Sequence, residues 1–260
     1  MPNYESMKAI ITGGTSGIGL ATARLLHARG ASVVMVDVKP AEDAPNDARA
    51  IFLPANLAYP DECEAVVAQA ANALGGLNAL VNSAGIQRYG KADETSWELW
   101  NEVLAVNLHA AFLMAKHCIP HFRASGGGAI VNVGSAQSHG SQQGAIAYVT
   151  SKHALLGLSR ALAVDHAAEG IRTNCVCPGT VDTPMWRWSV ARDPNPQGMI
   201  DSCVALHPIG RVGQSEEIAE AIAFLLSDSA SFVNGVAFDV DGGLTALIGG
   251  APKDKAKDKA

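Results

Sequence analysis

MKAIITGGTSGIG, residues 7–19, is the stretch of sequence that decides the fold. Its first half, residues 7–12, is an aliphatic run typical of a strand that is buried on both faces. Glycines then let the backbone turn tightly, and a helix is predicted over residues 17–29. The N-terminus of that helix offers free N–H groups to phosphates, and Thr15 and Ser16 add hydroxyl donors. The stretch therefore predicts a nucleotide-binding turn between a strand and a helix.

The same order of a short aliphatic run and a longer helical stretch continues along the chain. Further strands are predicted at residues 32–36, 50–53, 78–82, 129–133, 171–177 and 236–240. Further helices are predicted at 60–74, 147–168 and 215–227, and residues 96–122 are predicted to form one long helix or two joined ones. Strands without polar alternation that alternate with helices indicate right-handed βαβ units. The predicted fold class is α/β: a single-domain, Rossmann-type, doubly wound parallel sheet of about seven strands with helices on both faces. Residues 1–248 form this domain, and residues 249–260 form a polar tail.

Composition narrows the class of protein. The 260 residues are 48% hydrophobic and 17% charged, which suits a globular core, and the net charge is −6. An acidic chain without a basic stripe is a poor partner for nucleic acid. No signal peptide is visible, and no apolar run reaches the ~18–20 residues that cross a bilayer. The five cysteines are read as free thiols. We therefore expect a cytoplasmic protein that binds small molecules.

Asp37 stands at the end of the second predicted strand, 20 positions after Gly17. A carboxylate there accepts hydrogen bonds from both ribose hydroxyls of an adenosine and repels a 2′-phosphate. This favours NAD over NADP, although Lys39 lies nearby. The alternative interpretation is that Asp37 only closes the strand.

Tyr148 and Lys152 are four residues apart on a predicted helix and therefore share one face. Tyrosine, with a pKa of about 10, is a poor base at neutral pH. A cation within ~4–6 Å favours the phenolate and lowers the pKa of the tyrosine. Such a tyrosine can take a hydroxyl proton while hydride leaves the same carbon. Ser135, which follows the strand at 129–133, is placed to hold the substrate oxygen.

At these positions the sequence resembles the short-chain dehydrogenase/reductase family over about residues 7–243. The motifs that carry the resemblance are Thr12-Gly13-x-x-x-Gly17-x-Gly19, Asn82-Ser83-Ala84-Gly85, Asn107, Ser135, Tyr148-x-x-x-Lys152 and Pro178-Gly179. Their order and spacing together are highly specific. The resemblance implies an NAD(H)-dependent enzyme that acts on a CH–OH group and forms a homotetramer through the helices around 97–122 and 148–168 and the C-terminal strand.

The resemblance also implies a role for each catalytic residue. Tyr148 is the general acid/base, and Lys152 binds the nicotinamide ribose and lowers the pKa of the tyrosine. Ser135 holds the substrate oxygen. Asn107 fixes a water that continues a proton relay from Lys152, unless its amide only fills a helix kink.

The implied cofactor contacts are spread along the chain. They are Gly13, Thr15, Ser16, Gly17, Ile18, Gly19, Asp37, Asn56, Leu57, Asn82, Ala84, Gly85, Tyr148, Lys152, Pro178, Gly179, Val181 and Thr183. The chain departs from the family twice: Ser83 stands where Asn is commoner, and Asn56 stands where Asp is usual. An amide oxygen can still accept the bond that the aspartate makes with the adenine amino group.

Residues 180–211 lose periodicity, which is typical of a substrate lid beside the nicotinamide. Candidate substrate residues are Ser135, Gln137, Arg88, His139, Trp186 and Arg187. A guanidinium pairs with a carboxylate through two parallel bonds, which favours an anionic substrate. The alternative is that the arginines form only surface or subunit ion pairs.

The stretch 175–184 resembles the branch of hydroxybutyrate and sugar-acid (2-keto-3-deoxy-L-fuconate-type) dehydrogenases. The predicted reaction is hydride transfer between NAD and a small hydroxy acid or sugar acid. Three alternatives stay open: a dehydrogenase of neutral sugars or polyols, a 3-oxoacyl-thioester reductase that uses NADPH, and a dinucleotide sensor without turnover. Asp37 argues against the second of these. No metal is expected, because Pro120 separates His117 from His121 and ends the predicted helix.

Overall fold

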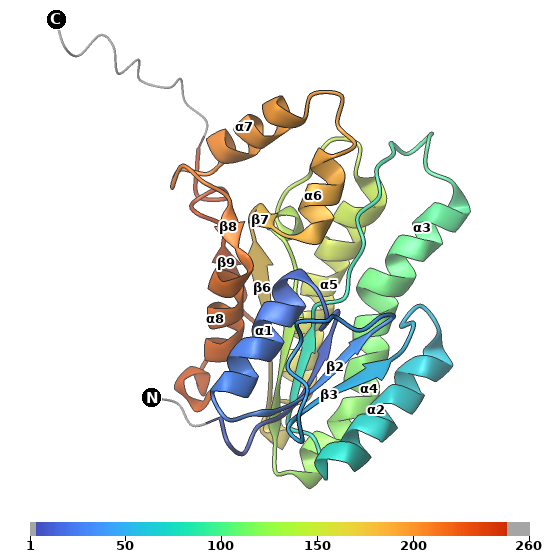
Figure 1. The fold of residues 1–260 in the computed structure, drawn as a ribbon, viewed down its shortest axis with the longest axis vertical. Coiled ribbons are helices and arrows are strands. Elements are labelled where there is room, and N and C mark those ends of the chain that lie inside the picture. Colours follow the sequence, from blue (N-terminus) through green and yellow to red (C-terminus); the bar gives the residue numbers. More distant parts are fainter. Residues whose placement is uncertain (1–3, 249–260) are drawn as a thin grey trace, which may run out of the picture.

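A seven-stranded parallel sheet forms the centre of the molecule. The computed structural model describes residues 4–248, so the predicted tail at 249–260 lies outside the described residues. The strands stand in the order β3-β2-β1-β4-β5-β6-β9 (Figure 1). Their bounds are β1 Lys8–Thr12, β2 Ser32–Asp37, β3 Ala50–Pro54, β4 Ala79–Asn82, β5 Gly128–Val133, β6 Ile171–Pro178 and β9 Ala237–Val240. The predicted fold class is confirmed.

Helices cover both faces of the sheet, and each strand contributes side chains to both of them. On one face lie α1 (Gly17–Ala28) and α8 (Ser215–Leu226); on the other lie α2 (Pro60–Leu74), α4 (Ala110–Ala124) and α5 (Ile146–Asp165). Successive side chains of a strand point to opposite faces. Ile11 accordingly packs with α1 and α8, whereas its neighbour Ile10 packs with α2 and α4.

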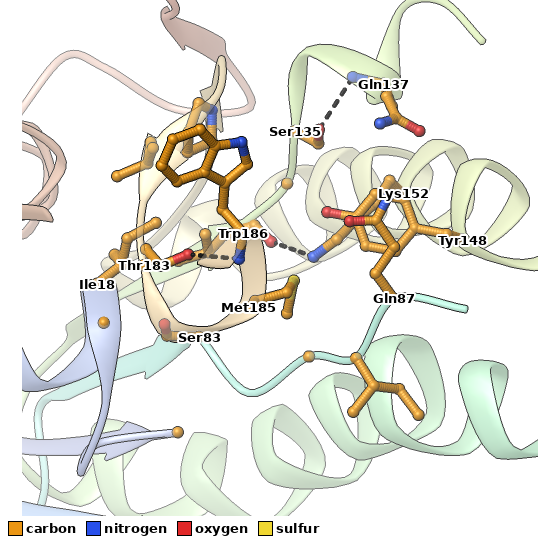
Figure 2. Close-up of a pocket in the computed structure, with 18 of the residues that line it drawn as sticks. Ile18, Ser83, Gln87, Ser135, Gln137, Tyr148, Lys152, Thr183, Met185 and Trp186 are labelled. Atoms are coloured by element: carbon orange, nitrogen blue, oxygen red, sulfur yellow. Dashed lines mark hydrogen bonds between the residues drawn. The ribbon is translucent and has the colours of Figure 1, made fainter. Parts of the chain in front are cut away.

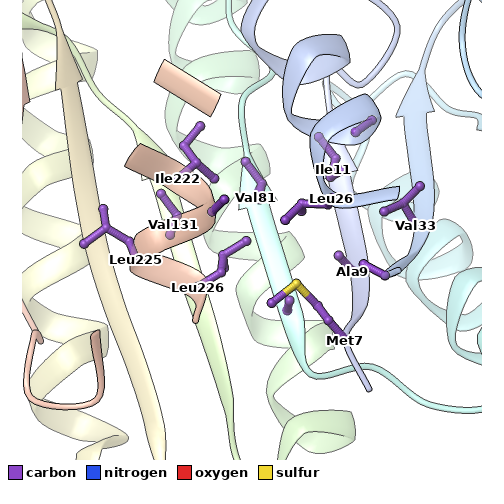
Figure 3. Close-up of a cluster of buried hydrophobic side chains, with 14 of the residues drawn as sticks. Met7, Ala9, Ile11, Leu26, Val33, Val81, Val131, Ile222, Leu225 and Leu226 are labelled. Carbon is purple, nitrogen blue, oxygen red and sulfur yellow. The ribbon is translucent and has the colours of Figure 1, made fainter. Parts of the chain in front are cut away.

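The core under α1 and α8 is mainly aliphatic (Figure 3). Leu26 from α1 and Ile222 from α8 are both fully buried against Ile11, Val81 and Val131 of the strands. Burying one such side chain stabilises the fold by about 1.5–3 kcal/mol. The two buried faces explain why the strands read as unbroken aliphatic runs.

The long helical stretch before β5 consists of joined helices, one of the two predicted arrangements, and differs from the prediction at Pro120. It comprises α3 (Trp97–Leu104), a π-helical turn (Ala105–His109) and α4, and Pro120 lies inside α4 instead of ending it. The buried side chains on either side of Pro120, among them Phe122, pack against the sheet and hold the helix together despite the missing N–H. The helix α8 begins at Ser215, and its N-cap is Gln214.

Trp97–Ala124 is also long and apolar enough to cross a membrane by length and composition. The sequence analysis found no such run. However, α4 packs against α2 and β4 on a face of the sheet, and its inner side chains are fully buried. It is therefore a core helix of a soluble fold.

The aperiodic segment after β6 contains regular structure. It holds β7 (Val181–Asp182), α6 (Pro184–Val190) and α7 (Pro196–Leu206), and β7 pairs with β8 (Gly213–Gln214). Short 3-10 turns stand at Ala136–Ser138, Ala167–Glu169 and Asp228–Ala230. In Figure 1 α6 and α7, in orange, stand beyond the carboxyl ends of the strands. Strand order reverses between β1 and β4, so a ligand crevice is expected at this end.

Candidate functional site

A cavity of about 930 Å³ lies at the carboxyl ends of the strands, beneath the segment that carries α6 and α7. Most of the predicted site residues line it: Gly13, Ser16, Gly17, Ile18, Asp37, Asn56, Leu57, Ala84, Gly85, Ser135, Gln137, His139, Tyr148, Lys152, Pro178, Gly179, Val181, Thr183 and Trp186. The predicted residues that do not line it are Thr15, Gly19, Asn82, Arg88, Asn107 and Arg187.

The glycine turn has a geometry that only glycine supplies. Gly13 and Gly17 have φ values of +62° and +48°, and a Cβ at Gly13 would lie 3.0 Å from the backbone of Ala84. Gly19 does not reach the cavity; a Cβ there would clash with the carbonyl oxygen of Gly13. Ser16 caps α1 without a side-chain hydrogen bond, so the side chain leaves the first N–H groups of the helix to a ligand.

Asp37 and Asn56 stand on the same side of the cavity. One carboxylate oxygen of Asp37 accepts a hydrogen bond of 2.8 Å from the N–H of Val38. The amide oxygen of Asn56 accepts one of 3.1 Å from the N–H of Ala58. Each oxygen keeps a second lone pair for a ligand.

A buried polar network fastens the strand ends behind the cavity. The hydroxyl of Thr12 accepts bonds of 3.1 Å from the N–H groups of Ser83 and Ala84. The Asn82 amide donates to Asn132 (2.8 Å), and Asn132 donates to the Ser159 hydroxyl (2.8 Å). Asn82 therefore braces the sheet. The sequence analysis missed Asn132, whose signal is a polar residue inside an otherwise aliphatic strand.

Ser135, Tyr148 and Lys152 meet at one wall of the cavity (Figure 2). The Lys152 Nζ lies 5.5 Å from the centre of the Tyr148 ring and donates a hydrogen bond of 2.7 Å to the Val133 carbonyl. Burial raises the pKa of Tyr148 to about 12, partly offset by a hydrogen bond with the Ser135 side chain. Burial also lowers the pKa of Lys152 to about 8.

This corrects one expectation. The sequence analysis expected Lys152 to lower the pKa of Tyr148, but in this structure that pKa is raised. The physical reason is that both groups are buried, and burial disfavours the charged form of each. The Lys152 Nζ donates its hydrogen bond to the Val133 carbonyl, and burial is the largest influence on the pKa of Tyr148.

Asn107 lies behind this wall, in the π-helical turn. Its amide donates 3.0 Å bonds to the Ile86 carbonyl and the Ser151 hydroxyl, and its oxygen accepts a 2.8 Å bond from the Ile86 N–H. The amide thus fills a helix distortion, which is the second of the two interpretations. A Cβ at Gly85 would lie 3.5 Å from the Asn107 oxygen and 3.7 Å from the Lys152 Nζ. The water relay through Asn107 stays a prediction.

Apart from Glu102, which pairs with Arg88, the polar groups on the substrate side of the cavity are mostly neutral. The Gln137 amide donates to the Gln142 side-chain oxygen (2.7 Å), as does Gln87 (3.4 Å). Among residues 4–248, the Gln137 oxygen and the Trp186 indole N–H are buried at this cavity without a hydrogen-bond partner. Figure 2 shows Trp186 across the cavity from Tyr148. Gln87 and Met185, which also line the cavity, were not singled out from the sequence.

The two predicted arginines point elsewhere. Arg88 pairs with Glu102 at 2.7 Å, and Arg187 forms a two-pronged pair with Asp182 at 2.7 and 2.9 Å. Neither lines the cavity, and no other arginine of the described residues does. Glu102 itself lines the cavity and holds the partly buried Arg88 behind it, whereas Asp182 holds the exposed Arg187 on the surface. The structure therefore supports the alternative interpretation, that these arginines form ion pairs.

The chain is similar over nearly its whole length to known dehydrogenases. Residues 13–245 match the family model described as enoyl-(acyl carrier protein) reductase. The chain is 41% identical to cis-4-hydroxycyclohexanecarboxylate dehydrogenase of Sinomonas cyclohexanicum, over 94% of this chain and 98% of that protein. It is 39% identical to cyclohexanol dehydrogenase of Acinetobacter sp. (strain SE19), over 94% and 96% of the two chains.

A solved structure has the same fold over nearly the whole chain. The ligand-free aldohexose dehydrogenase of Thermoplasma acidophilum superposes with a TM-score of 0.89 at 34% identity, over 97% of this chain and 99% of that one. These relatives are named for cyclic alcohols, a hydroxy acid and a sugar. The hydroxybutyrate and 2-keto-3-deoxy sugar-acid branch that the sequence suggested is not confirmed.

Proposed function

The chain belongs to the short-chain dehydrogenase/reductase family, and we propose that it is an NAD-dependent dehydrogenase of a small neutral alcohol, most simply a carbocyclic alcohol or diol. The observation that carries the proposal is that Ser135, Tyr148 and Lys152 line one cavity together with the glycine turn and Asp37. A plain Rossmann-type domain needs none of these three side chains at that place.

The cavity fits a nicotinamide dinucleotide. The turn at Gly13–Gly17 and the uncapped N-terminus of α1 offer N–H groups to a pyrophosphate, and Asp37 offers oxygens to an adenosine ribose. The carboxylate would repel a 2′-phosphate, which favours NAD. When bound, the nicotinamide ring supplies the hydride acceptor or donor.

The chain's own residues handle the proton. In alcohol oxidation, the Ser135 hydroxyl holds the substrate oxygen and Tyr148 accepts the hydroxyl proton. Lys152 and Tyr148 are buried together, so they lose protons as a pair. Because the pKa of Lys152 is lowered to about 8, the pair carries one proton fewer above that pH. The singly deprotonated pair includes the form with a charged lysine and a phenolate, which is the base that oxidation needs.

The substrate class follows from the neutral lining. A buried carboxylate needs a cationic partner, and the arginines of the described residues lie outside the cavity. The unpartnered Gln137 oxygen and Trp186 N–H instead offer one acceptor and one donor, which suit a second hydroxyl of a neutral substrate. The named activity of the Acinetobacter relative agrees with this choice. We therefore place the neutral alcohol ahead of the hydroxy acid or sugar acid.

We also propose a cytoplasmic homotetramer. Phe112 on α4 and Val164 on α5 are 49% and 79% exposed, on helices that the family resemblance assigns to subunit contacts. Light scattering of the purified chain tests this: a mass four times that of the monomer is expected, and a monomer would overturn it.

Initial-rate NAD reduction tests the function, with cyclohexanol, cyclohexane-1,2-diol and cis-4-hydroxycyclohexanecarboxylate as a matched set. A neutral compound is expected to exceed the carboxylate in kcat/KM by about tenfold or more, since an unpaired buried charge costs more than that. Preference for the carboxylate would restore the hydroxy-acid hypothesis. NADPH oxidation with a 3-oxoacyl thioester would favour the reductase. NADH binding without any turnover would indicate a sensor.

Trp186→Phe and Gln137→Leu test in the same assay whether these two side chains bind the substrate. Trp186→Phe removes the unpartnered indole N–H. Gln137→Leu removes the unpartnered oxygen and, with it, the amide that donates to Gln142. We expect KM for the diol to rise roughly three- to tenfold, with KM for NAD unchanged, because a lost hydrogen bond costs about 0.5–1.5 kcal/mol. An unchanged KM for every alcohol would remove these two residues from substrate recognition.

A further inference from the structure

Three potential metal ligands converge at the end of the last two strands, and of these only His139 lines the cavity. They are Cys177 on β6, Asp239 on β9 and His139, just after the 3-10 turn Ala136–Ser138. Cys177 and Asp239 are direct partners in the β6–β9 register, so their side chains leave the sheet on the same face. The sequence separations between the three residues hide the cluster from any motif search.

The geometry brings one atom from each residue into a small space. The His139 Nε2 lies 2.9 Å from an Asp239 carboxylate oxygen, and the imidazole also hydrogen-bonds with the Cys177 thiol. All three ligand atoms lie within 4.8 Å of one another. Two ligands of one zinc ion at tetrahedral angles stand about 3.3–3.8 Å apart, given bonds of about 2.0–2.3 Å. Small side-chain rotations therefore bring the three atoms to coordination distance.

We propose that His139, Cys177 and Asp239 form a binding site for Zn²⁺. An imidazole nitrogen, a thiolate and a carboxylate are the donor types that Zn²⁺ takes in proteins, and together with the ion they sum to zero net charge. The three protein ligands leave a fourth position for water on the exposed side, since His139 and Asp239 are solvent-accessible while Cys177 is fully buried.

The location links the metal to the substrate side. His139 lines the cavity and ends the turn that carries Ser135 and Gln137. An ion held by His139 fastens this turn to the ends of β6 and β9. Because a ligand that binds only the folded chain stabilises it by mass action, Zn²⁺ raises the melting temperature.

The test is titration of the purified full chain with Co²⁺, followed by displacement with Zn²⁺ under a non-chelating reductant. We expect one equivalent of Co²⁺ to give a thiolate charge-transfer band that Zn²⁺ abolishes. His139→Ala, Asp239→Asn and Cys177→Ser should each weaken Zn²⁺ binding about tenfold or more, because each removes a direct ligand. His139 and Asp239 are exposed, so their variants remain folded if Cys177→Ser does not.

His27 and Asp47 provide a matched control. They form a histidine–carboxylate pair of the same 2.9 Å length with no thiol in the cluster. His27→Ala should leave Zn²⁺ affinity and the Zn²⁺-induced rise in melting temperature unchanged. The proposal is overturned if no charge-transfer band forms, or if Zn²⁺ binding persists in His139→Ala and Asp239→Asn. Because the readouts are spectral and thermal, they hold whether or not the proposed alcohol is a substrate.

Discussion

The cofactor half and the predicted lid, the segment that carries α6 and α7, are built in opposite ways. In the cofactor half, α1 buries six of its residues against the sheet and α8, and the glycine turn is fixed by backbone contacts. In the lid, α7 buries none of its residues and α6 buries only Ser189. The lid is held by surface pairs such as Arg187–Asp182, and Arg192 stacks on Trp188 at 4.1 Å.

The difference teaches where rigidity is needed. A pyrophosphate site depends on backbone N–H groups, which must be in place before the ligand arrives. A lid must open and close, and segments with few buried contacts open at low free-energy cost. Substitutions in the cofactor half are therefore expected to lower stability and NADH binding. Substitutions in the lid are expected to change stability and KM only slightly.

Alanine at two helical glycines would show the largest contrast. In Gly19→Ala the new Cβ meets the Gly13 carbonyl, which cannot move without disturbing the turn. We expect a loss of about 1–3 kcal/mol in the free energy of unfolding, together with weaker NADH binding. In Gly198→Ala, on α7, the Cβ meets only the end of the Asn195 side chain. The loss of that cap, about 1 kcal/mol, is offset by a similar gain in helix propensity.

Denaturant unfolding and NADH fluorescence measure both effects. Gly157→Ala on α5 is the control, since no atom of the same chain lies within 4 Å of its Cβ position. It should stabilise the helix by up to about 1 kcal/mol. Equal losses at Gly19 and Gly198 would contradict the contrast between the two halves.

Cofactor preference is the next largest effect. Asp37→Asn removes the charge that repels a 2′-phosphate and keeps the shape of the side chain. The ratio of kcat/KM for NAD to that for NADP should fall roughly 10- to 100-fold, corresponding to about 1–3 kcal/mol. Glu42→Gln, on the loop after β2 and outside the cavity, is the control and should change nothing. An unchanged ratio in Asp37→Asn would mean that Asp37 only closes its strand.

The pH dependence of the reaction tests the proposed proton transfer by Tyr148 and Lys152. The pKa of Lys152 is lowered to about 8 by burial, so the Lys152–Tyr148 pair loses a proton as the pH rises through that value. Alcohol oxidation needs the deprotonated pair and should rise roughly tenfold between about pH 7 and 9, while reduction should fall. Lys152→Arg keeps its charge at all these pH values, so its profile should lose the step near pH 8. A flat wild-type profile over this range would contradict this assignment.

The smallest effect is expected at the lid surface. Arg187→Ala breaks an exposed ion pair with Asp182, which is worth less than about 1 kcal/mol. Melting temperature and KM for the alcohol should therefore hardly change, and Arg88→Ala should behave alike. A large rise in KM for an anionic substrate in either variant would show that the arginine reaches the cavity when the lid closes.

The contrast also explains what the sequence could predict. The strand–turn–helix at residues 7–29 is dictated locally, by glycines that no other residue can replace, so the sequence analysis located it closely. Tyr148 and Lys152 were found because their spacing on one helix puts them together. These are local rules, and they hold whatever the rest of the chain does.

Features that depend on tertiary contacts could not be predicted in the same way. Pro120 was expected to end its helix, but packing of the neighbouring side chains on the sheet extends it to Ala124. The helices α6 and α7 bury too little to show a periodic pattern. The surface partners of Arg88 and Arg187, and the meeting of His139 with Cys177 and Asp239, arise only from the folded arrangement.

Tyr148→Phe, assayed for NADH affinity and for alcohol oxidation on the same preparation, tests the central claim most directly. The substitution removes only the phenolic hydroxyl from the cavity wall. The account predicts that NADH binds within about threefold of wild type while kcat falls by about 10²–10⁴, the usual contribution of a general acid/base. Turnover at the wild-type rate, with NADH still bound, would show that Tyr148 does not move the proton and would contradict the account.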